Sequence, residues 1–278
     1  MPRESGAESR DPELPTPVFK SSASRLAPRI QVRGLAGKRT MVARTAAHVT
    51  NRPMTVFLDG PRMPPARGGK ADALVILLHG YGSNGADLIS LAPYWAKASP
   101  GAAFVSPNAI EPVPQAPGGY QWFPISNLDP HLMEQGAKYA AQSVDRFIDR
   151  ELEKHGLDES RLVLVGFSQG TMMALYTGLR RTRPVAGILG FSGVLVGRKL
   201  KDEMRSKPPV LLIHGDRDPT IPIAAMFDSA EQLAAADHGA QWHVSYGVPH
   251  SIGQDGLDLG GAFLASCLKT KAIARATR

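Results

Sequence analysis

Ser168 stands in a sequence context that suits a nucleophile. The motif reads Gly166-Phe167-Ser168-Gln169-Gly170, with an apolar run before it and a helix-forming run after it. A strand, a sharp turn and a helix in this order form a nucleophile elbow, which presents the serine hydroxyl on strained backbone. A side chain at either glycine would press against the neighbouring strand or helix. We predict that Ser168 is a nucleophile; the alternative is an ordinary serine in a tight turn.

A late histidine is available as the base that a serine hydroxyl needs. Such a base takes the hydroxyl proton and is itself oriented by a carboxylate. In the chain order serine, acid, histidine, the candidates are His238, His243 and His250. His243 falls inside an alternating strand pattern and His238 at a helix end, whereas His250 follows a strand end in a loop. We therefore predict His250 as the base.

Two aspartates follow one predicted strand and could supply the acid. Asp216 and Asp218 both stand shortly after residues 209–213. We choose Asp218, with Asp216 as the alternative, although a loop-capping role suits Asp216 better. His79 and His214 each precede a glycine at a strand end. We expect both to be hydrogen-bonded structural histidines rather than ligands.

A glycine-rich loop at residues 79–85 follows a buried strand and exposes backbone N–H groups. Such groups could hold a phosphate or an oxyanion. No Lys-Ser or Lys-Thr closes the loop, as a phosphate-binding P-loop requires. We predict an oxyanion hole formed by the N–H groups of Tyr81 and of Gln169, the residue after the nucleophile.

A long segment, residues 111–130, is rich in proline, glycine and aromatic residues. Loops of this length are usually functional or disordered. We predict that Trp122 and Phe123 line a substrate site, and a purely structural role is the alternative.

The cysteine and histidine pattern does not favour a metal site. His238 and His243 have a spacing that zinc sites allow, but Cys267 is the single cysteine, so no cysteine pair accompanies them. We expect neither metal nor cofactor. A lone cysteine also fits a reducing compartment, and we expect a cytoplasmic protein.

The net charge of +7 is concentrated at the start of the chain. Residues 1–52 hold ten of the 32 basic residues and four of the 25 acidic residues, which leaves 22 against 21 in the rest. The remainder therefore carries no polyanion footprint, and we expect no nucleic-acid partner.

Residues 1–53 are rich in Pro, Ser, Ala and Arg and lack hydrophobic periodicity. We expect this segment to be a disordered extension. Two other interpretations are an organellar transit peptide and a gene-model extension, in which the natural chain starts at Met41 or Met54. The segment has no apolar stretch typical of a secretory signal, and no run in the chain is long enough to span a membrane. We expect residues 54–278 to form one domain.

Apolar runs alternate with helix-like segments along this domain, which predicts a mostly parallel, twisted α/β sheet with helices on both faces. Functional groups of such sheets gather beyond the carboxyl ends of the strands, where Tyr81, Ser168, Asp218 and His250 are expected. The connection at residues 194–209 leaves no room for a large lid. Strands are predicted at residues 55–58, 73–78, 103–105, 162–165, 185–191, 209–213 and 241–246, and helices at 87–98, 132–155, 171–176, 223–236 and 257–272.

Together the motifs resemble the α/β-hydrolases of the phospholipase/carboxylesterase family, which includes acyl-protein thioesterases. The resemblance covers about residues 55–271 and rests on Leu78-His79-Gly80-Tyr81-Gly82, the serine motif, His214-Gly215-Asp216-Arg217-Asp218-Pro219-Thr220-Ile221-Pro222 and the late His250. It implies Ser168, Asp218 and His250 as a catalytic triad and Tyr81 and Gln169 as oxyanion donors. Trp122-Phe123 matches the aromatic pocket segment of the family.

The resemblance implies a serine carboxylesterase that hydrolyses small esters with short to medium acyl chains, lysophospholipids or thioesters through an acyl-enzyme. Tyr81 replaces the leucine, and Ser83-Asn84 the acidic residue, usual in the thioesterase branch, which favours a carboxylesterase of bacterial type. The alternatives are an acyl-protein thioesterase and a non-catalytic binding protein with this fold. A homodimer stays open.

Overall fold

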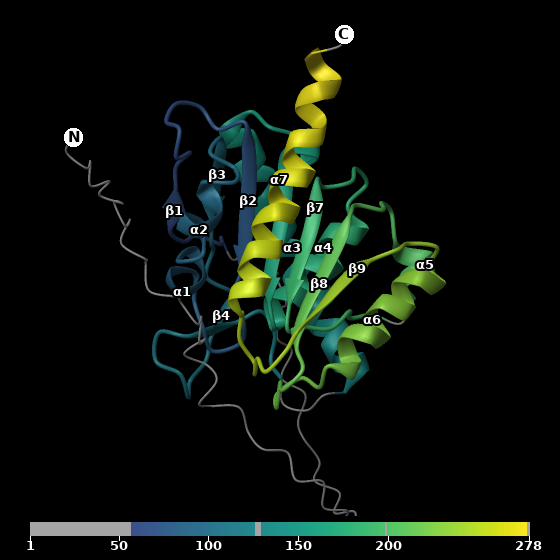
Figure 1. Cartoon of the computed structure of the whole chain (residues 1–278). Helices are drawn as coiled ribbons and strands as arrows, with labels where there is room; N and C mark the ends of the chain where they lie inside the picture. Colours follow the sequence, from purple (N-terminus) through teal and green to yellow (C-terminus); the bar gives the residue numbers. More distant parts are fainter. Residues whose placement is uncertain (1–56, 126–128, 198, 277–278) are drawn as a thin grey trace, which may run out of the picture.

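The computed structural model describes residues 57–125, 129–197 and 199–276, with side chains described to residue 269. The expected extension at residues 1–53 lies outside the described residues. Within these described residues the central sheet has seven strands in the order β1-β3-β2-β6-β7-β8-β9, of which only β1 runs antiparallel to its neighbour. Figure 1 shows α7 crossing one face of the sheet and α3 and α4 behind the other. The predicted α/β-hydrolase fold with a mostly parallel sheet is confirmed.

The strands of the main sheet are β1 (Arg62–Met63), β2 (Ala73–Leu78), β3 (Ala102–Val105), β6 (Leu162–Phe167), β7 (Gly187–Phe191), β8 (Val210–Gly215) and β9 (Gln241–Ser245). The helices are α1 (Gly85–Ile89), α2 (Ala92–Ala96), α3 (Pro130–His155), α4 (Gln169–Arg180), α5 (Leu200–Glu203), α6 (Ala224–Ala235) and α7 (Gln254–Ala276). A separate hairpin pairs β4 (Glu111–Pro112) with β5 (Tyr120–Gln121).

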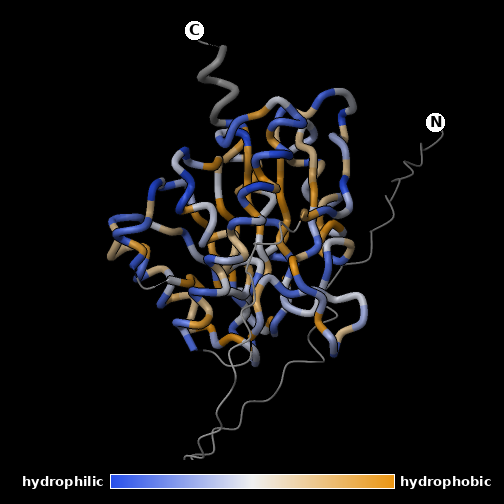
Figure 2. Tube along the Cα trace, turned by 180° about the vertical axis from the view of Figure 1, so that it is seen from behind, coloured by the Kyte–Doolittle hydropathy of each residue, from blue (hydrophilic) through white to orange (hydrophobic). Residues whose placement is uncertain are grey.

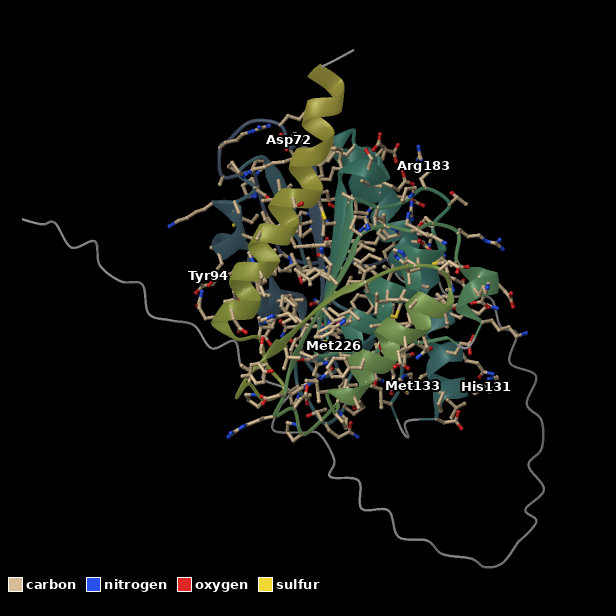
Figure 3. All side chains as sticks on the ribbon, turned by 45° about the vertical axis from the view of Figure 1, so that its right-hand side comes forward. Asp72, Tyr94, His131, Met133, Arg183 and Met226 are labelled. Atoms are coloured by element: carbon tan, nitrogen blue, oxygen red, sulfur yellow. The ribbon has the colours of Figure 1, made fainter. Side chains whose placement is uncertain are left out.

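Alternating side chains of the strands feed two cores, one on each face of the sheet. On β2, Leu74 and Ile76 pack into the core beneath α3, α4 and α6, whereas Val75 and Leu77 pack beneath α1, α2 and α7. Because both faces are covered, the strands read as continuous apolar runs, which form the orange centre of the tube in Figure 2. Figure 3 shows the side chains that fill these layers, with Met226 buried and Arg183 at the periphery.

Two of the predicted elements differ from the structure. The helix expected at residues 87–98 is broken into α1 and α2, because Pro93 lacks an N–H and stands in the first turn of α2. The edge strand expected at residues 55–58 is wrong for its described residues 57 and 58; the edge strand is instead β1, paired with β3.

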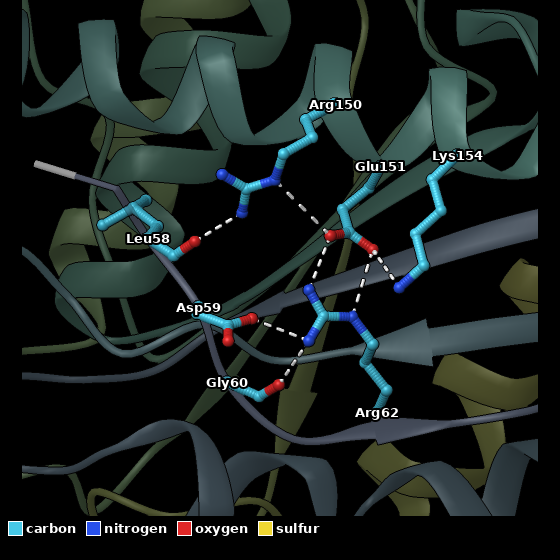
Figure 4. A network of polar contacts seen from close by, with 7 residues as sticks. All are labelled: Leu58, Asp59, Gly60, Arg62, Arg150, Glu151 and Lys154. Atoms are coloured by element: carbon cyan, nitrogen blue, oxygen red, sulfur yellow. Dashed lines mark hydrogen bonds and ion pairs between the residues drawn. The ribbon is translucent and has the colours of Figure 1, made fainter. Parts of the chain in front are cut away.

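An ion pair between a partly exposed arginine and a buried carboxylate fixes β1 against α3 (Figure 4). Arg62 donates from Nη2 to Oε1 of Glu151 at 2.6 Å and from Nε to Oε2 at 3.3 Å. The Glu151 side chain is only 1% exposed, and these hydrogen bonds raise the pKa of Arg62 above its usual value. Arg150 also donates to the carbonyl of Leu58 at 2.5 Å. The first described residues are thereby fastened to the longest helix.

The connection at residues 194–209 contains only the short helix α5, and in the part of the chain described by the structure no insertion forms a large lid. Of the helices described, none is both long and apolar enough to cross a membrane.

Candidate active site

Ser168 occupies the sharp turn between β6 and α4. Its backbone has φ 54° and ψ −117°, a left-handed conformation that L-residues rarely adopt. A Cβ on Gly166 would collide with the backbone of Gly170 and Thr171, and one on Gly170 would collide with the carbonyl of Leu78. Neither position therefore admits a side chain, as the elbow motif predicted.

His250 lies between the serine and an aspartate. Its Nε2 is 3.0 Å from Ser168 Oγ, and its Nδ1 is 2.7 Å from Asp218 Oδ2. An ionised carboxylate can only accept, so Nδ1 carries the proton in the neutral ring and Nε2 is free to accept from the serine hydroxyl. The ring of Phe167 packs against the imidazole, with 5.0 Å between centroids. The structure thus brings the three predicted residues together in one series of hydrogen bonds.

The carboxylate of Asp218 is fully buried and richly hydrogen-bonded. Oδ1 accepts from the backbone N–H groups of Thr220 at 2.8 Å and Ile221 at 2.9 Å. Burial alone would raise the pKa of this carboxyl, but hydrogen bonds from His214 and His250 outweigh it and hold the pKa well below the usual value. Asp218 is therefore a fixed anion.

Asp216, the alternative acid, has a different task. Its side chain is exposed, and its Oδ1 accepts from the backbone N–H of Gly247 at 2.5 Å. It joins the loops that follow β8 and β9, which is the loop-capping role that its position favoured.

The predicted oxyanion donors flank the serine. A Cβ on Gly80 would lie 3.3 Å from Ser168 Cβ, so the glycine-rich loop is packed directly against the elbow. Gln169 is the first residue of α4, where backbone N–H groups lack a partner inside the helix. Among the described residues, no acceptor takes the N–H of Tyr81 or Gln169. Within the described residues both N–H groups are therefore unpaired, and their role as oxyanion donors stays a prediction.

His79 is buried beneath this loop as a structural residue. Its Nδ1 donates to the carbonyl of Gly80 at 2.8 Å, and its Nε2 accepts from the N–H of Ala109 at 3.0 Å. Because one ring nitrogen must accept, the ring is neutral, and burial lowers its pKa to about 4. The imidazole therefore holds the shape of the glycine-rich loop without carrying charge.

Trp122 and Phe123 are 0% and 1% exposed and belong to the core under α3 and α4. Trp122 donates from Nε1 to the carbonyl of His79 at 2.8 Å. The Gln169 side chain accepts from the Trp122 N–H at 2.9 Å and donates to the Phe123 carbonyl at 2.7 Å. This is the structural role that we held as the alternative, and contact with substrate stays a prediction.

The remaining late histidines lie outside this arrangement. Nε2 of His243 is 2.8 Å from Oδ2 of Asp255, and burial lowers the pKa of His238. Sequence reasoning did not predict two features of this site. One is the pair of hydrogen bonds from the Gln169 side chain to the backbone of Trp122 and Phe123, and the other is the contact between His214 and Asp218. The only signal for the second was the spacing of His214 and Asp218, four residues apart in one motif.

Comparison with known proteins gives a consistent result. The profile of a family described as Phospholipase/Carboxylesterase matches residues 65–268. The crystal structure of esterase PE8 is similar, with 44% identity and a TM-score of 0.73 over 77% of this chain and 100% of that chain. Acyl-protein thioesterase 1 of Gibberella zeae is 30% identical over 72% of this chain and 92% of its own. Acyl-protein thioesterase 1 of Saccharomyces cerevisiae is 29% identical over 70% of this chain and 93% of its own.

Proposed function

The chain belongs to the phospholipase/carboxylesterase family, and we propose that it hydrolyses carboxylic esters or thioesters with Ser168, His250 and Asp218 as its catalytic triad. The observation that carries this proposal is the unbroken series of contacts from Ser168 Oγ through both nitrogens of His250 to Asp218, at 3.0 and 2.7 Å. A serine hydroxyl becomes a useful nucleophile only with such a base beside it.

In the first half of the reaction, Ser168 Oγ attacks the substrate carbonyl carbon while its proton moves to His250 Nε2. The resulting imidazolium is stabilised by the Asp218 carboxylate. Negative charge that develops on the carbonyl oxygen is held by the N–H groups of Tyr81 and Gln169, each of which contributes on the order of a hundredfold in rate.

In the second half, the tetrahedral intermediate collapses and the bond to the leaving alcohol or thiol breaks. The leaving group takes the proton from His250 Nε2, and an acyl-enzyme remains on Ser168. Water then loses a proton to Nε2 and attacks the acyl carbonyl. Collapse of the second intermediate returns this proton to Ser168 Oγ and releases the carboxylic acid.

We propose small esters with short to medium acyl chains as substrates, with lysophospholipids and thioesters to be compared. The small connection at residues 194–209 supports an open site, and the 44% identity to esterase PE8 supports a carboxylesterase over a protein thioesterase. The proposal needs no nucleic acid and no insertion into a membrane. A cytoplasmic location is supported by the single cysteine, and light scattering would decide between a monomer and a homodimer.

The test is Ser168→Ala, with Ser266→Ala on the exposed face of α7 as the matched control. Turnover of a chromogenic butyrate ester should fall more than about a thousandfold in the first variant and stay unchanged in the second. A fluorophosphonate probe should label the wild type and the control only. Undiminished turnover by a folded Ser168→Ala variant would remove the assignment, and an unlabelled wild type would favour the binding protein.

A further inference from the structure

His214 is buried at the end of β8, directly beside the acid of the triad. Its side chain is 1% exposed and that of Asp218 0%. Nε2 of His214 lies 3.2 Å from Asp218 Oδ2 and 2.9 Å from the carbonyl oxygen of Ile221. Neither partner has a proton to give, because one is a carbonyl and the other an anion. Nε2 must therefore carry the proton and donate.

We propose that His214 is a positioning residue that holds Asp218 Oδ2 in place for His250. The inference rests on the proposed function, because it concerns the acid of the same triad. Oδ2 is the oxygen that faces His250 Nδ1 at 2.7 Å and His214 Nε2 at 3.2 Å, so both imidazoles contact the same atom. Oδ1 is held by two backbone N–H groups of the turn that carries Asp218 itself.

The origin of each donor explains why His214 matters. The donors to Oδ1 belong to the same turn as Asp218, so they move with it and cannot fix it to the sheet. His214 is the last residue but one of β8, between β7 and β9, and among the described groups that contact the carboxylate it is the one that lies in a strand. Without it, the turn and its carboxylate could shift together relative to the sheet and draw Oδ2 away from His250.

The shared oxygen also affects how strongly Asp218 attracts a proton on His250. A donor from His214 neutralises part of the charge on Oδ2 and thereby weakens its hold on the imidazolium. Among the described residues, Asp218 has no ion-pair partner other than the two histidines. The other titratable groups of the same turn and of α6 and β9 are exposed or half-buried: Asp216, Arg217, Asp228, Glu231 and His243.

The experiment compares His214→Met, which removes the donor, with His214→Gln, whose amide nitrogen can approach the position of Nε2. His238→Met, at a buried histidine outside the site, is the control for the loss of a buried imidazole. For ester hydrolysis we expect kcat to fall roughly 10- to 100-fold in His214→Met with a small change in KM. The acidic limb of its pH–rate profile should be displaced, because both the position of Oδ2 and the charge that it presents to His250 change. His214→Gln should keep most of the wild-type kcat and most of the wild-type pH–rate profile. His238→Met should lower the stability of the fold but change neither kcat nor the pH–rate profile.

A second measurement is independent of turnover. The measurement is the low-field ¹H NMR signal of the His250 Nδ1 proton, recorded in the Ser168→Ala background. Relative to Ser168→Ala alone, this signal should shift when His214→Met is added and should stay near its position when His214→Gln is added. If His214→Met does not fold, His214→Asn, whose amide is too short to reach Oδ2, takes its place. A folded variant lacking the donor with unchanged kcat, pH profile and proton signal would overturn the proposal, as would equal losses in His214→Gln. Active Ser168→Ala would instead overturn the proposed function.

Discussion

The side chain of Gln169 is bonded at both ends to the backbone of Trp122 and the residue after it. Its Oε1 accepts from the Trp122 N–H at 2.9 Å and its Nε2 donates to the Phe123 carbonyl at 2.7 Å. The indole of Trp122 in turn donates to the carbonyl of His79, in the loop that contains Tyr81, the other proposed oxyanion donor. The residue that we propose as a backbone oxyanion donor therefore also ties the two neighbouring loops to the elbow.

Gln169→Ala should lower kcat without removing the backbone N–H of residue 169. The change leaves the buried N–H of Trp122 and the carbonyl of Phe123 without partners, which costs about 1–3 kcal/mol per group and loosens the oxyanion loop. We expect kcat to fall roughly 10- to 100-fold, measured by steady-state hydrolysis of a butyrate ester. Gln135→Ala, at an exposed position of α3, should change neither kcat nor the melting temperature. Equal activity in the two variants would show that the clamp is dispensable.

Gly170→Ala should destabilise the fold, although alanine is the better helix former. The added methyl would meet the Leu78 carbonyl of β2, which precedes the oxyanion loop, so strand and helix must separate. We expect the free energy of unfolding in urea to fall by at least about 2 kcal/mol. Gly239→Ala, where a Cβ would meet nothing within 4 Å, should stay within about 0.5 kcal/mol of the wild type. Matching unfolding curves for the two variants would contradict the steric account.

The buried strands and the meeting of Ser168, Asp218 and His250 could be predicted from sequence because the signals for each segment are local. The apolar run of β2 is buried on both faces, and its predicted bounds agree with the structure. Ser168 and His250 are 82 positions apart, yet parallel strands deliver their carboxyl ends to one edge, which explains why the motifs converge.

Other features depend on contacts that no local pattern contains. Strand β1 has two residues and no periodicity, and its place is fixed by Arg62 and Glu151, 89 positions apart. The clamp of Gln169 requires two backbone groups that reach it only after the loop containing Trp122 has folded. The contact between His214 and Asp218 likewise depends on how the turn after β8 closes.

Glu151→Gln tests the ion pair that fastens β1. The amide keeps the shape of the side chain but loses the charge that faces Arg62, in a position where the carboxylate is 1% exposed. We expect a loss of about 1–3 kcal/mol in the free energy of unfolding, measured in urea. Asp59 also pairs with Arg62, but the side chain of Asp59 is 75% exposed. Asp59→Asn should therefore lower the free energy of unfolding by less than about 1 kcal/mol. A larger loss for Asp59→Asn would reverse our ranking of the two contacts.

Asp218→Asn should lose both turnover and a pH-dependent part of the stability. The pKa of this carboxyl is lower in the folded chain than the value near 3.9 expected when unfolded, so acid protonates the unfolded chain first. The stabilisation is therefore complete above about pH 5 and declines as the pH falls toward the folded pKa.

We expect the wild type to exceed Asp218→Asn by on the order of 2 kcal/mol in free energy of unfolding at pH 7. Urea unfolding at successive pH values should show this difference shrinking between about pH 5 and pH 3. Asp216→Asn controls for loss of charge in the same turn, because its amide oxygen can still accept from Gly247. In ester hydrolysis, kcat should fall on the order of 10⁴-fold in Asp218→Asn, since an amide cannot hold His250 in the required tautomer as a carboxylate does. A difference that stays constant down to pH 3 would mean that the carboxylate is not stabilised by its buried donors.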